Sequence, residues 1–129
     1  KNMEKKVIFT PTAPKPVGAY SQAVVYNDLL FVSGQISIDP DTDKLEIGDV
    51  EKETRIIFSN LKNILQTAGS SLEKVLKVTI YITSMDDYPK VDAIYKANFV
   101  EPFPARAIVE GSRLPKNVNV EMDVTAYVN

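Results

Sequence analysis

The chain of 129 residues has the length of one domain, and 44% of its residues are hydrophobic, which is enough for a core. It contains 15 basic and 17 acidic residues and has no cysteine, histidine or tryptophan. This composition excludes disulfides, cysteine nucleophiles, zinc sites built from thiolates or imidazoles, and catalytic triads with histidine. The net charge of −2 argues against general nucleic-acid binding, which requires a basic surface.

The start of the chain carries the basic residues Lys1, Lys5 and Lys6, which we interpret as a solvated terminus. No apolar segment there is followed by a small-residue cleavage site, as a secretory signal requires. No apolar run approaches the roughly 18 residues of a membrane span. We therefore expect a cytoplasmic protein with no membrane partner.

The first strands are expected near the N-terminus. Residues 7–9 are apolar and predict a short strand, after which several prolines predict an irregular segment. Residues 23–26 and 29–32 are also apolar and flank Asn27-Asp28. Asn and Asp tolerate the positive φ of a tight turn, so this segment predicts a β-hairpin.

Carboxylates are dense between Asp39 and Glu53, but their spacing does not fit the calcium loop of an EF-hand. A solvated loop that leads into an acidic first helical turn is the simpler interpretation. The strongest helical periodicity follows, over residues 50–68, with Asp49 as the N-cap and Gly69 as the terminator. Its apolar stripe consists of Val50, Thr54, Ile57, Phe58, Leu61, Ile64, Leu65 and Ala68.

The second half of the chain predicts three strands and one helix. Residues 76–82 alternate with a period of two, and Leu76, Val78, Ile80 and Ile82 form the apolar side. A helix with Pro89 in its first turn follows and ends before Pro102. Its shared face consists of Val91, Ile94, Tyr95, Asn98 and Phe99. Residues 105–110 and 118–128 are the last two strands, and the latter alternates most clearly.

The predicted order is therefore β-β-β-α-β-α-β-β in one domain over residues 1–129, an α+β fold with two helices on one face of a mixed six-stranded sheet. Two helices leave the other face uncovered. That face carries the semi-polar residues Thr79, Tyr81, Thr125 and Tyr127. It must meet water or another subunit, so self-association is expected.

Arg106 is the first candidate functional residue, because it lies in an otherwise apolar strand and a buried guanidinium needs a partner. A structural salt bridge is one interpretation. The other is bidentate binding of a small carboxylate, which the guanidinium fork fits.

Four more residues are weaker candidates on their own. Glu121 lies on a strand side with other polar residues and is simply solvated unless it points into a pocket, where it could orient or deprotonate water. Ser33-Gly34 follows an apolar strand, where a glycine marks either a turn or a close ligand approach. Tyr20 is either a core aromatic residue or part of a pocket wall. No phosphate-binding glycine loop is present.

Taken together, these segments resemble a known family. Residues 104–115 (PARAIVEGSRLP) followed by Val120-Glu121-Met122 resemble the signature of the RidA/YjgF/UK114 family. Residues 17–22, 31–36 and Asp39-Pro40 resemble its other blocks. The likeness extends over roughly residues 13–127, and several blocks in the right order are far more specific than one motif.

The resemblance implies a chorismate-mutase-like fold and a homotrimer around a central barrel-like core, with clefts between subunits. It also implies hydrolysis of reactive enamines and imines such as 2-aminoacrylate, which pyridoxal-phosphate enzymes release, to 2-keto acids and ammonia. This is the activity of a 2-iminobutanoate/2-iminopropanoate deaminase, and it needs no cofactor and no metal.

The same resemblance assigns roles to the candidates. Arg106 would hold the substrate carboxylate, and Glu121 would position the hydrolytic water or transfer a proton. Tyr20 and Ser33 would line the cleft. Gly34 and the backbone at Ile108 would approach the ligand.

Two positions depart from the family. Many members have cysteine where this chain has Ile108, so an activity that depends on that cysteine is excluded. Many have asparagine where this chain has Asp92, for which a helix-surface position is the simpler expectation. If Asp92 lay near the cleft, its charge would oppose an anionic substrate.

Three functions remain open, although the sequence offers nothing specific for the third, a stabilising or chaperone-like partner of other proteins. The first is imine deamination, which Arg106 favours because other subgroups lack this arginine. The second is a non-catalytic trimer that binds 2-keto acids and regulates metabolism. Family members have also been described as ribonucleases, but the negative net charge and the absence of a basic-aromatic surface argue against nucleic acid as a partner.

Overall fold

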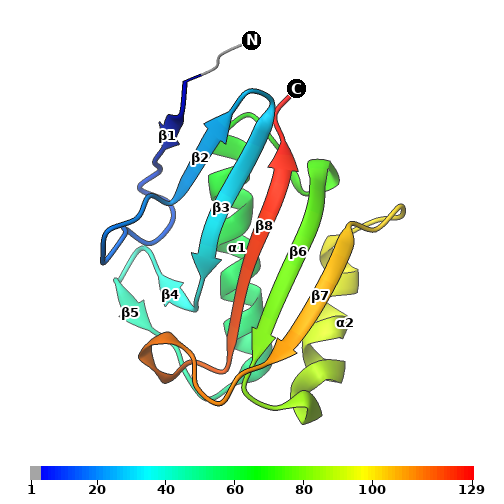
Figure 1. Ribbon diagram of the computed structural model, residues 1–129. Coiled ribbons are helices and arrows are strands. Elements are labelled where there is room, and N and C mark those ends of the chain that lie inside the picture. Colours follow the sequence, from blue (N-terminus) through cyan, green and yellow to red (C-terminus); the bar gives the residue numbers. More distant parts are fainter. Residues whose placement is uncertain (1–3) are drawn as a thin grey trace.

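The computed structural model describes residues 4–129, so Lys1 lies outside the described residues. A six-stranded mixed sheet runs through the molecule in the order β1-β2-β3-β8-β6-β7 (Figure 1). All neighbouring strands are antiparallel except β6 and β7, which are parallel. The strands are β1 (Lys6–Ile8), β2 (Ala23–Tyr26), β3 (Leu29–Gln35), β6 (Val75–Ile82), β7 (Ala105–Glu110) and β8 (Val120–Tyr127).

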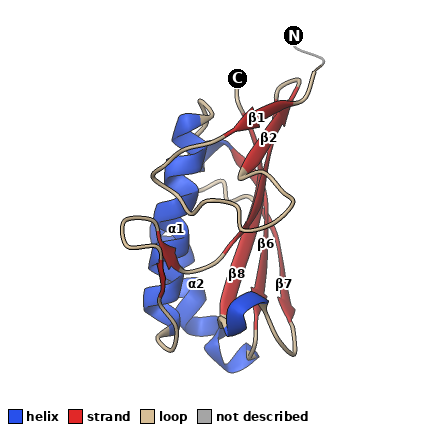
Figure 2. Ribbon diagram, turned by 90° about the vertical axis from the view of Figure 1, so that its left-hand side faces the viewer, coloured by secondary structure: helices blue, strands red, loops and turns tan. Residues whose placement is uncertain are grey.

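Both helices, α1 (Val50–Thr67) and α2 (Tyr88–Asn98), pack on the same face of this sheet (Figure 2). The apolar stripe of α1 is buried against the inward residues of the strands. On α2, Val91 and Tyr95 are buried, and the ring of Phe58 on α1 meets that of Tyr95 edge-on at 6.2 Å. The predicted α+β class with two helices on one sheet face is confirmed.

The ends of α1 are fixed by local hydrogen bonds. The Asp49 side chain accepts a hydrogen bond from the backbone N–H of Lys52, as an N-cap does. At the other end Gly69 has φ of 81°, and the N–H groups of Gly69 and Ser70 donate to the carbonyls of Gln66 and Leu65. This is a Schellman motif, in which glycine is favoured because φ is positive.

The β2–β3 hairpin turns at Asn27, whose φ is 59°, as the Asn-Asp pair predicts.

The acidic segment is more ordered than a solvated loop, because it contains the short paired strands β4 (Ile38–Asp39) and β5 (Lys44–Leu45). Among residues 4–129, no group of His, Cys, Asp or Glu side chains could hold a metal ion. Single 3₁₀ turns occur at η1 (Leu72–Lys74), η2 (Met85–Asp87) and η3 (Pro115–Asn117).

Two details of the strands differ from the sequence prediction. The pairing of β6 with β8 shifts between Val75 and Lys77, so the expected inward residue Leu76 turns outward and is 46% exposed, while Val75 is buried. This bulge breaks the alternation at the beginning of β6. The last strand begins at Val120 rather than at residue 118, because the positive φ of Lys116 and Asn117 ends the preceding turn.

Within residues 4–129, no helix or further strand covers the sheet face opposite the helices (Figure 2). The strand pairings place the predicted Thr79, Tyr81, Thr125 and Tyr127 on it. Exposed hydrophobic side chains share this face: Val7, Leu29, Phe31 and Val109. We call it the open face.

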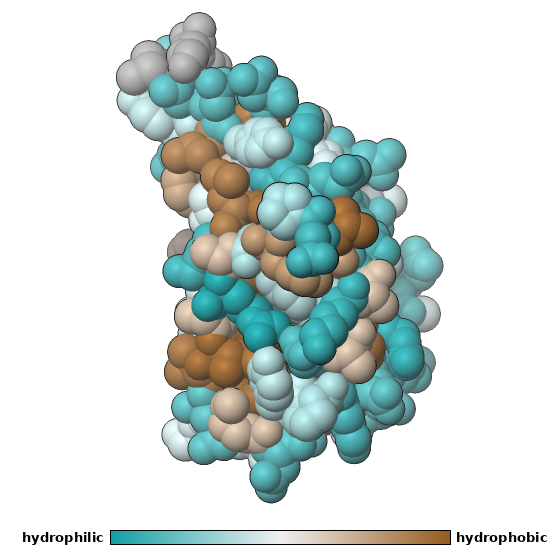
Figure 3. All heavy atoms as spheres, turned by 90° about the vertical axis from the view of Figure 1, so that its right-hand side faces the viewer, coloured by the Kyte–Doolittle hydropathy of each residue, from teal (hydrophilic) through white to brown (hydrophobic). Residues whose placement is uncertain are grey.

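Seen from the side of β7 and α2, hydrophobic side chains form separate patches among hydrophilic ones (Figure 3).

Within residues 4–129, no helix is long and apolar enough to cross a membrane.

Candidate active site

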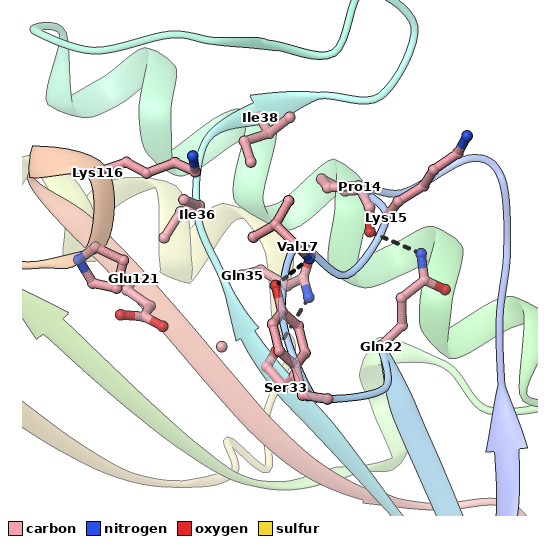
Figure 4. A pocket seen from close by; sticks show the side chains of 13 residues that line it. Pro14, Lys15, Val17, Gln22, Ser33, Gln35, Ile36, Ile38, Lys116 and Glu121 are labelled. Atoms are coloured by element: carbon pink, nitrogen blue, oxygen red, sulfur yellow. Dashed lines mark hydrogen bonds between the residues drawn. The ribbon is translucent and has the colours of Figure 1, made fainter.

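A pocket of about 360 Å³ opens where the end of β3 meets the beginning of β8 (Figure 4). This volume suits a small ligand. Four of the predicted site residues contribute to its walls, together with residues of the proline-rich segment and of η3. The lining consists of Pro14, Lys15, Val17, Tyr20, Gln22, Ser33, Gly34, Gln35, Ile36, Ile38, Pro115, Lys116 and Glu121.

Glu121 is the second residue of β8, where it lies opposite Tyr81 on the open face and reaches the pocket. Its carboxylate lies directly above Gly34: a Cβ atom at position 34 would overlap Oε2 and would be 3.0 Å from Cδ of Glu121. Gly34 thus allows the glutamate to lie across β3. The role expected of Gly34 was close approach to a ligand, and its observed neighbour is this carboxylate.

Burial raises the pKa of the Glu121 carboxyl above its ordinary value, and the nearby charge of Asp123 adds to this effect. A glutamate with a raised pKa accepts a proton more readily than an exposed one. The solvated position that was the simpler expectation for Glu121 is therefore wrong, since the side chain is half-buried in a pocket.

Ser33 lies where the pairing of β3 with β8 is interrupted, between Val32 and Gln35. Its Oγ donates a hydrogen bond of 2.6 Å to the carbonyl of Ser21. The hydroxyl proton is therefore in use, and the oxygen has lone pairs left with which to accept. Tyr20 is half-exposed at the pocket wall, and its hydroxyl accepts a bond of 3.3 Å from the N–H of Val17.

Gln22 holds the proline-rich wall in place. Its side chain is buried, accepts from the N–H of Thr10 at 2.7 Å, and donates to the carbonyl of Pro14 at 2.9 Å (Figure 4). Two cationic side chains, Lys15 and Lys116, also line the pocket. The sequence alone does not predict the contributions of these three residues, because they lie outside the long helices and strands, where no periodicity indicates which side chain turns inward.

Arg106 lies elsewhere, on β7 opposite Val78, which places its side chain on the helix face of the sheet. Its Nη1 donates to Oδ1 of Asp92 at 2.7 Å, and its Nη2 donates to the hydroxyl of Tyr88 at 2.8 Å. Its guanidinium carbon is 4.7 Å from the centre of the Tyr95 ring, a cation–π contact. We call these four residues the arginine cage; Lys96, Phe103 and Pro104 also border it.

Asp92 is a correction to the sequence analysis, which expected an ordinary helix-surface residue. Its side chain is only 15% exposed and forms an ion pair with Arg106, whose side chain is 26% exposed. Burial opposes ionisation of Asp92, but hydrogen bonds from Arg106 and Lys96 outweigh it and hold the pKa below its ordinary value. Asp92 is therefore a charged partner of Arg106.

The predicted site residues thus fall into two groups within one chain. Tyr20, Ser33, Gly34 and Glu121 surround the pocket, whereas Arg106 lies three strands away from β3, about 14 Å at the usual strand spacing. Ile108 lies in the middle of β7. Among the described strands, β7 pairs only with β6, so backbone groups along its outer edge have no strand partner there.

Comparison with known proteins decides the family. The profile of the family described as Endoribonuclease L-PSP matches residues 10–128, nearly the whole chain. The chain belongs to this family, which includes the RidA and RutC proteins. The resemblance found in the sequence is thereby confirmed.

Some relatives of this chain are named only by family, and others by an activity. It is 48% identical over 125 residues to a RutC family protein of Pyrococcus abyssi, covering 97% of this chain and 98% of that one. It is 38% identical over 119 residues to a 2-iminobutanoate/2-iminopropanoate deaminase of Dermatophagoides farinae, covering 92% and 93%.

Solved structures of the RidA family agree with the fold. A Rid family protein of unknown function from Yersinia pestis has a TM-score of 0.95 and 44% identity, covering 97% of this chain and 100% of that one. TdcF of E. coli, solved with bound serine, has a TM-score of 0.90 and 35% identity, covering 95% and 98%.

Proposed function

We propose that this chain hydrolyses small 2-imino acids, and the enamines that tautomerise to them, to 2-keto acids and ammonia. Such a substrate has one carboxylate and one electrophilic C=N carbon. The protein must bind the carboxylate and deliver one oriented water molecule. Positioning and electrostatics are sufficient for this reaction, which fits a chain without cysteine or histidine.

The proposal rests on the Arg106 guanidinium, which its neighbours hold in place but which still has free N–H donors. Asp92 and Tyr88 use two of its five N–H groups, so three remain for a ligand, and the side chain is still 26% exposed. A held guanidinium with free donors is suited to bind a carboxylate in bidentate fashion. The deaminase of D. farinae and the serine bound to TdcF, itself a small acid with a nitrogen on C2, support this choice.

In the proposed reaction, Glu121 accepts a proton from the water that attacks C2 of the imine. The proton passes from Glu121 to the imine nitrogen, which gives a carbinolamine with a hydroxyl and an NH2 group on C2. The hydroxyl proton then moves through Glu121 to the NH2 group, the C–N bond breaks, and ammonia leaves while the oxygen forms the keto group. Ser33 can accept a hydrogen bond from the substrate or the water, and Tyr20 closes the pocket wall. No cofactor takes part in these steps.

We further propose that two subunits share each site, because Arg106 and Glu121 lie far apart in one chain. The arginine cage and the outer edge of β7 at Ile108 would come from one subunit, and the pocket around Glu121 from its neighbour. The homotrimer implied by the family resemblance would supply this pairing. The open face and its exposed hydrophobic residues support such an assembly.

The first prediction tests the proposed reaction directly. An imino acid is generated in situ with an amino-acid oxidase, and release of the keto acid is followed with and without the protein. We expect acceleration by the wild type, and a decrease of kcat/KM by about 10- to 100-fold for Arg106→Ala, because hydrogen bonds between charged groups are lost.

The matched control is Arg55→Ala, which removes an exposed arginine from α1 and should behave as wild type. Thermal unfolding of both variants shows whether the fold is retained. If Arg106→Ala is folded and as fast as wild type, the assignment of Arg106 is wrong. If the wild type binds a 2-keto acid but does not accelerate hydrolysis of the imino acid, a non-catalytic regulator that binds 2-keto acids is the better function.

A further inference from the structure

We propose that Asp92 fixes the orientation of the Arg106 guanidinium and that Lys96 compensates the negative charge of Asp92. The guanidinium, which we call the Arg106 clamp, then still attracts an anion. This inference rests on the proposed function, because it concerns the residue that would bind the substrate carboxylate. Asp92 is a positioning residue in this arrangement, and Lys96 is its charge compensator.

The geometry is a row of three charged groups. Oδ1 of Asp92 accepts from Nη1 of Arg106 at 2.7 Å, and Oδ2 of the same carboxylate lies 3.3 Å from Nζ of Lys96. Lys96 follows Asp92 by one turn of α2, the spacing at which helical side chains meet. Two cationic groups thus flank the Asp92 carboxylate, and the three side chains together carry one net positive charge.

Asp92 also fixes where that charge lies. Arg106 is held by Asp92 on Nη1, by the hydroxyl of Tyr88 on Nη2, and by the face of the Tyr95 ring beneath it. These contacts limit the rotation of a long side chain before a ligand arrives. Pre-orientation of this kind reduces the entropy that ligand binding would otherwise lose.

Lys96 matters because Asp92 alone would leave the pair with Arg106 neutral. A negative charge beside the Arg106 guanidinium opposes the binding of an anionic substrate. The Lys96 side chain is 69% exposed, so its effect is moderate and is screened by salt. It contacts only Asp92 among these groups, so it acts on the ligand through charge.

The test measures KM and kcat for an imino acid and, separately, the dissociation constant of 2-oxobutanoate by calorimetry, all at low ionic strength. Lys96→Met should raise KM and the dissociation constant about threefold and leave kcat unchanged, and the effect should disappear near 1 M salt. Lys90→Met, which removes another exposed lysine of α2, is the control and should change neither constant.

The decisive variant is the double substitution Asp92→Asn/Lys96→Met. Asparagine can still accept from Nη1, and the net charge returns to one positive unit, so both constants should return to within about twofold of wild type. A purely structural role for either residue predicts additive losses instead. Additive losses, or a Lys96→Met protein with wild-type constants at low salt, overturn the inference.

The two measurements separate this inference from the proposed function. If the wild type binds 2-oxobutanoate with the predicted dependence on Lys96 and Asp92 but does not accelerate hydrolysis, only the proposed reaction fails. If hydrolysis depends on Arg106 but not on this charge balance, only the inference fails. A protein that shows neither binding nor hydrolysis refutes both.

Discussion

At the scale of single residues, Gly34 and Glu121 depend on each other. The glutamate carboxylate occupies the space that a side chain at position 34 would need, and it is held in a half-buried place where its charge is disfavoured. A carboxylate whose ionised form is disfavoured by burial is typical of a site for proton transfer, because such perturbed groups cluster at functional sites.

The second prediction concerns the pH dependence of Glu121. The proposed base must be ionised, so kcat/KM should fall as the pH decreases through its pKa, with a midpoint above the ordinary glutamate value of about 4.3. Because the folded-state pKa is raised, ionisation of Glu121 destabilises the native protein as the pH rises. Glu121→Gln should therefore be nearly inactive, yet have a higher Tm than the wild type at pH 7.

Asp123→Asn is the comparison variant, since Asp123 shares the same strand side and acts on Glu121 through its charge but does not line the pocket, so the midpoint of the pH dependence should move to lower pH. This variant should retain most of the activity. If the residual kcat/KM of Glu121→Gln still falls at low pH as it does in the wild type, another group or the substrate itself causes the pH dependence.

Sequence reasoning reached most of the pocket but not the arginine cage. Glu121, Ser33, Gly34 and Tyr20 were predicted as site residues, and they do surround one pocket. Asp92 was expected at the helix surface, because a carboxylate on an amphipathic helix is typically exposed. Its pairing with Arg106 depends on how α2 lies over β7, which local periodicity does not specify.

At the scale of elements, Glu53 connects the helix layer to the pocket. This α1 residue is fully buried and accepts hydrogen bonds from the backbone N–H of Asn119 at 2.9 Å and from its side chain at 2.8 Å, as well as from Gly48. Asn119 directly precedes β8, and the turn before it carries Lys116. Glu53 therefore helps to set where β8 begins, and with it Glu121.

The third prediction follows from this link. Glu53→Gln keeps the volume but offers only one oxygen to three donors, so buried N–H groups lose their acceptor. We expect the free energy of unfolding to decrease by about 1–3 kcal/mol, measured by urea denaturation. Glu51→Gln, an exposed neighbour in the first turn of the same helix, should change it by less than about 0.5 kcal/mol. Equal stability of both variants would mean that Asn119 finds other acceptors.

The elements themselves follow closely from patterning. The apolar stripe of α1 and its two caps, the Asn27 turn and the alternation of β8 all lie where periodicity predicts them. Leu76 is the exception, because its outward position results from a bulge against β8. A bulge depends on the pairing partner, and the alternation of β6 taken by itself therefore predicts the wrong side for this residue.

At the scale of the whole molecule, the sheet has one face covered by helices and one open face with exposed hydrophobic residues. The fourth prediction is that the chain assembles through this face. Size-exclusion chromatography with light scattering should give three times the 14.3 kDa of one chain. Val109→Lys should reduce the mass toward one chain and lower activity with it, because a charge would be placed in the interface.

Ile47→Lys is the matched control, because Ile47 is similarly exposed but lies in the loop between β5 and α1, outside the six-stranded sheet. It should leave both mass and activity unchanged. A wild-type chain that elutes as a monomer and is fully active would remove the need for a shared site.

The arginine cage has one more consequence, which is optical. The chain has six tyrosines and no tryptophan, so its intrinsic fluorescence comes from tyrosine alone. Two of these, Tyr88 and Tyr95, lie against the guanidinium that would receive the ligand. A carboxylate that binds there changes the hydrogen bond and the charge next to both rings, so the protein carries its own reporter of site occupancy without any added label.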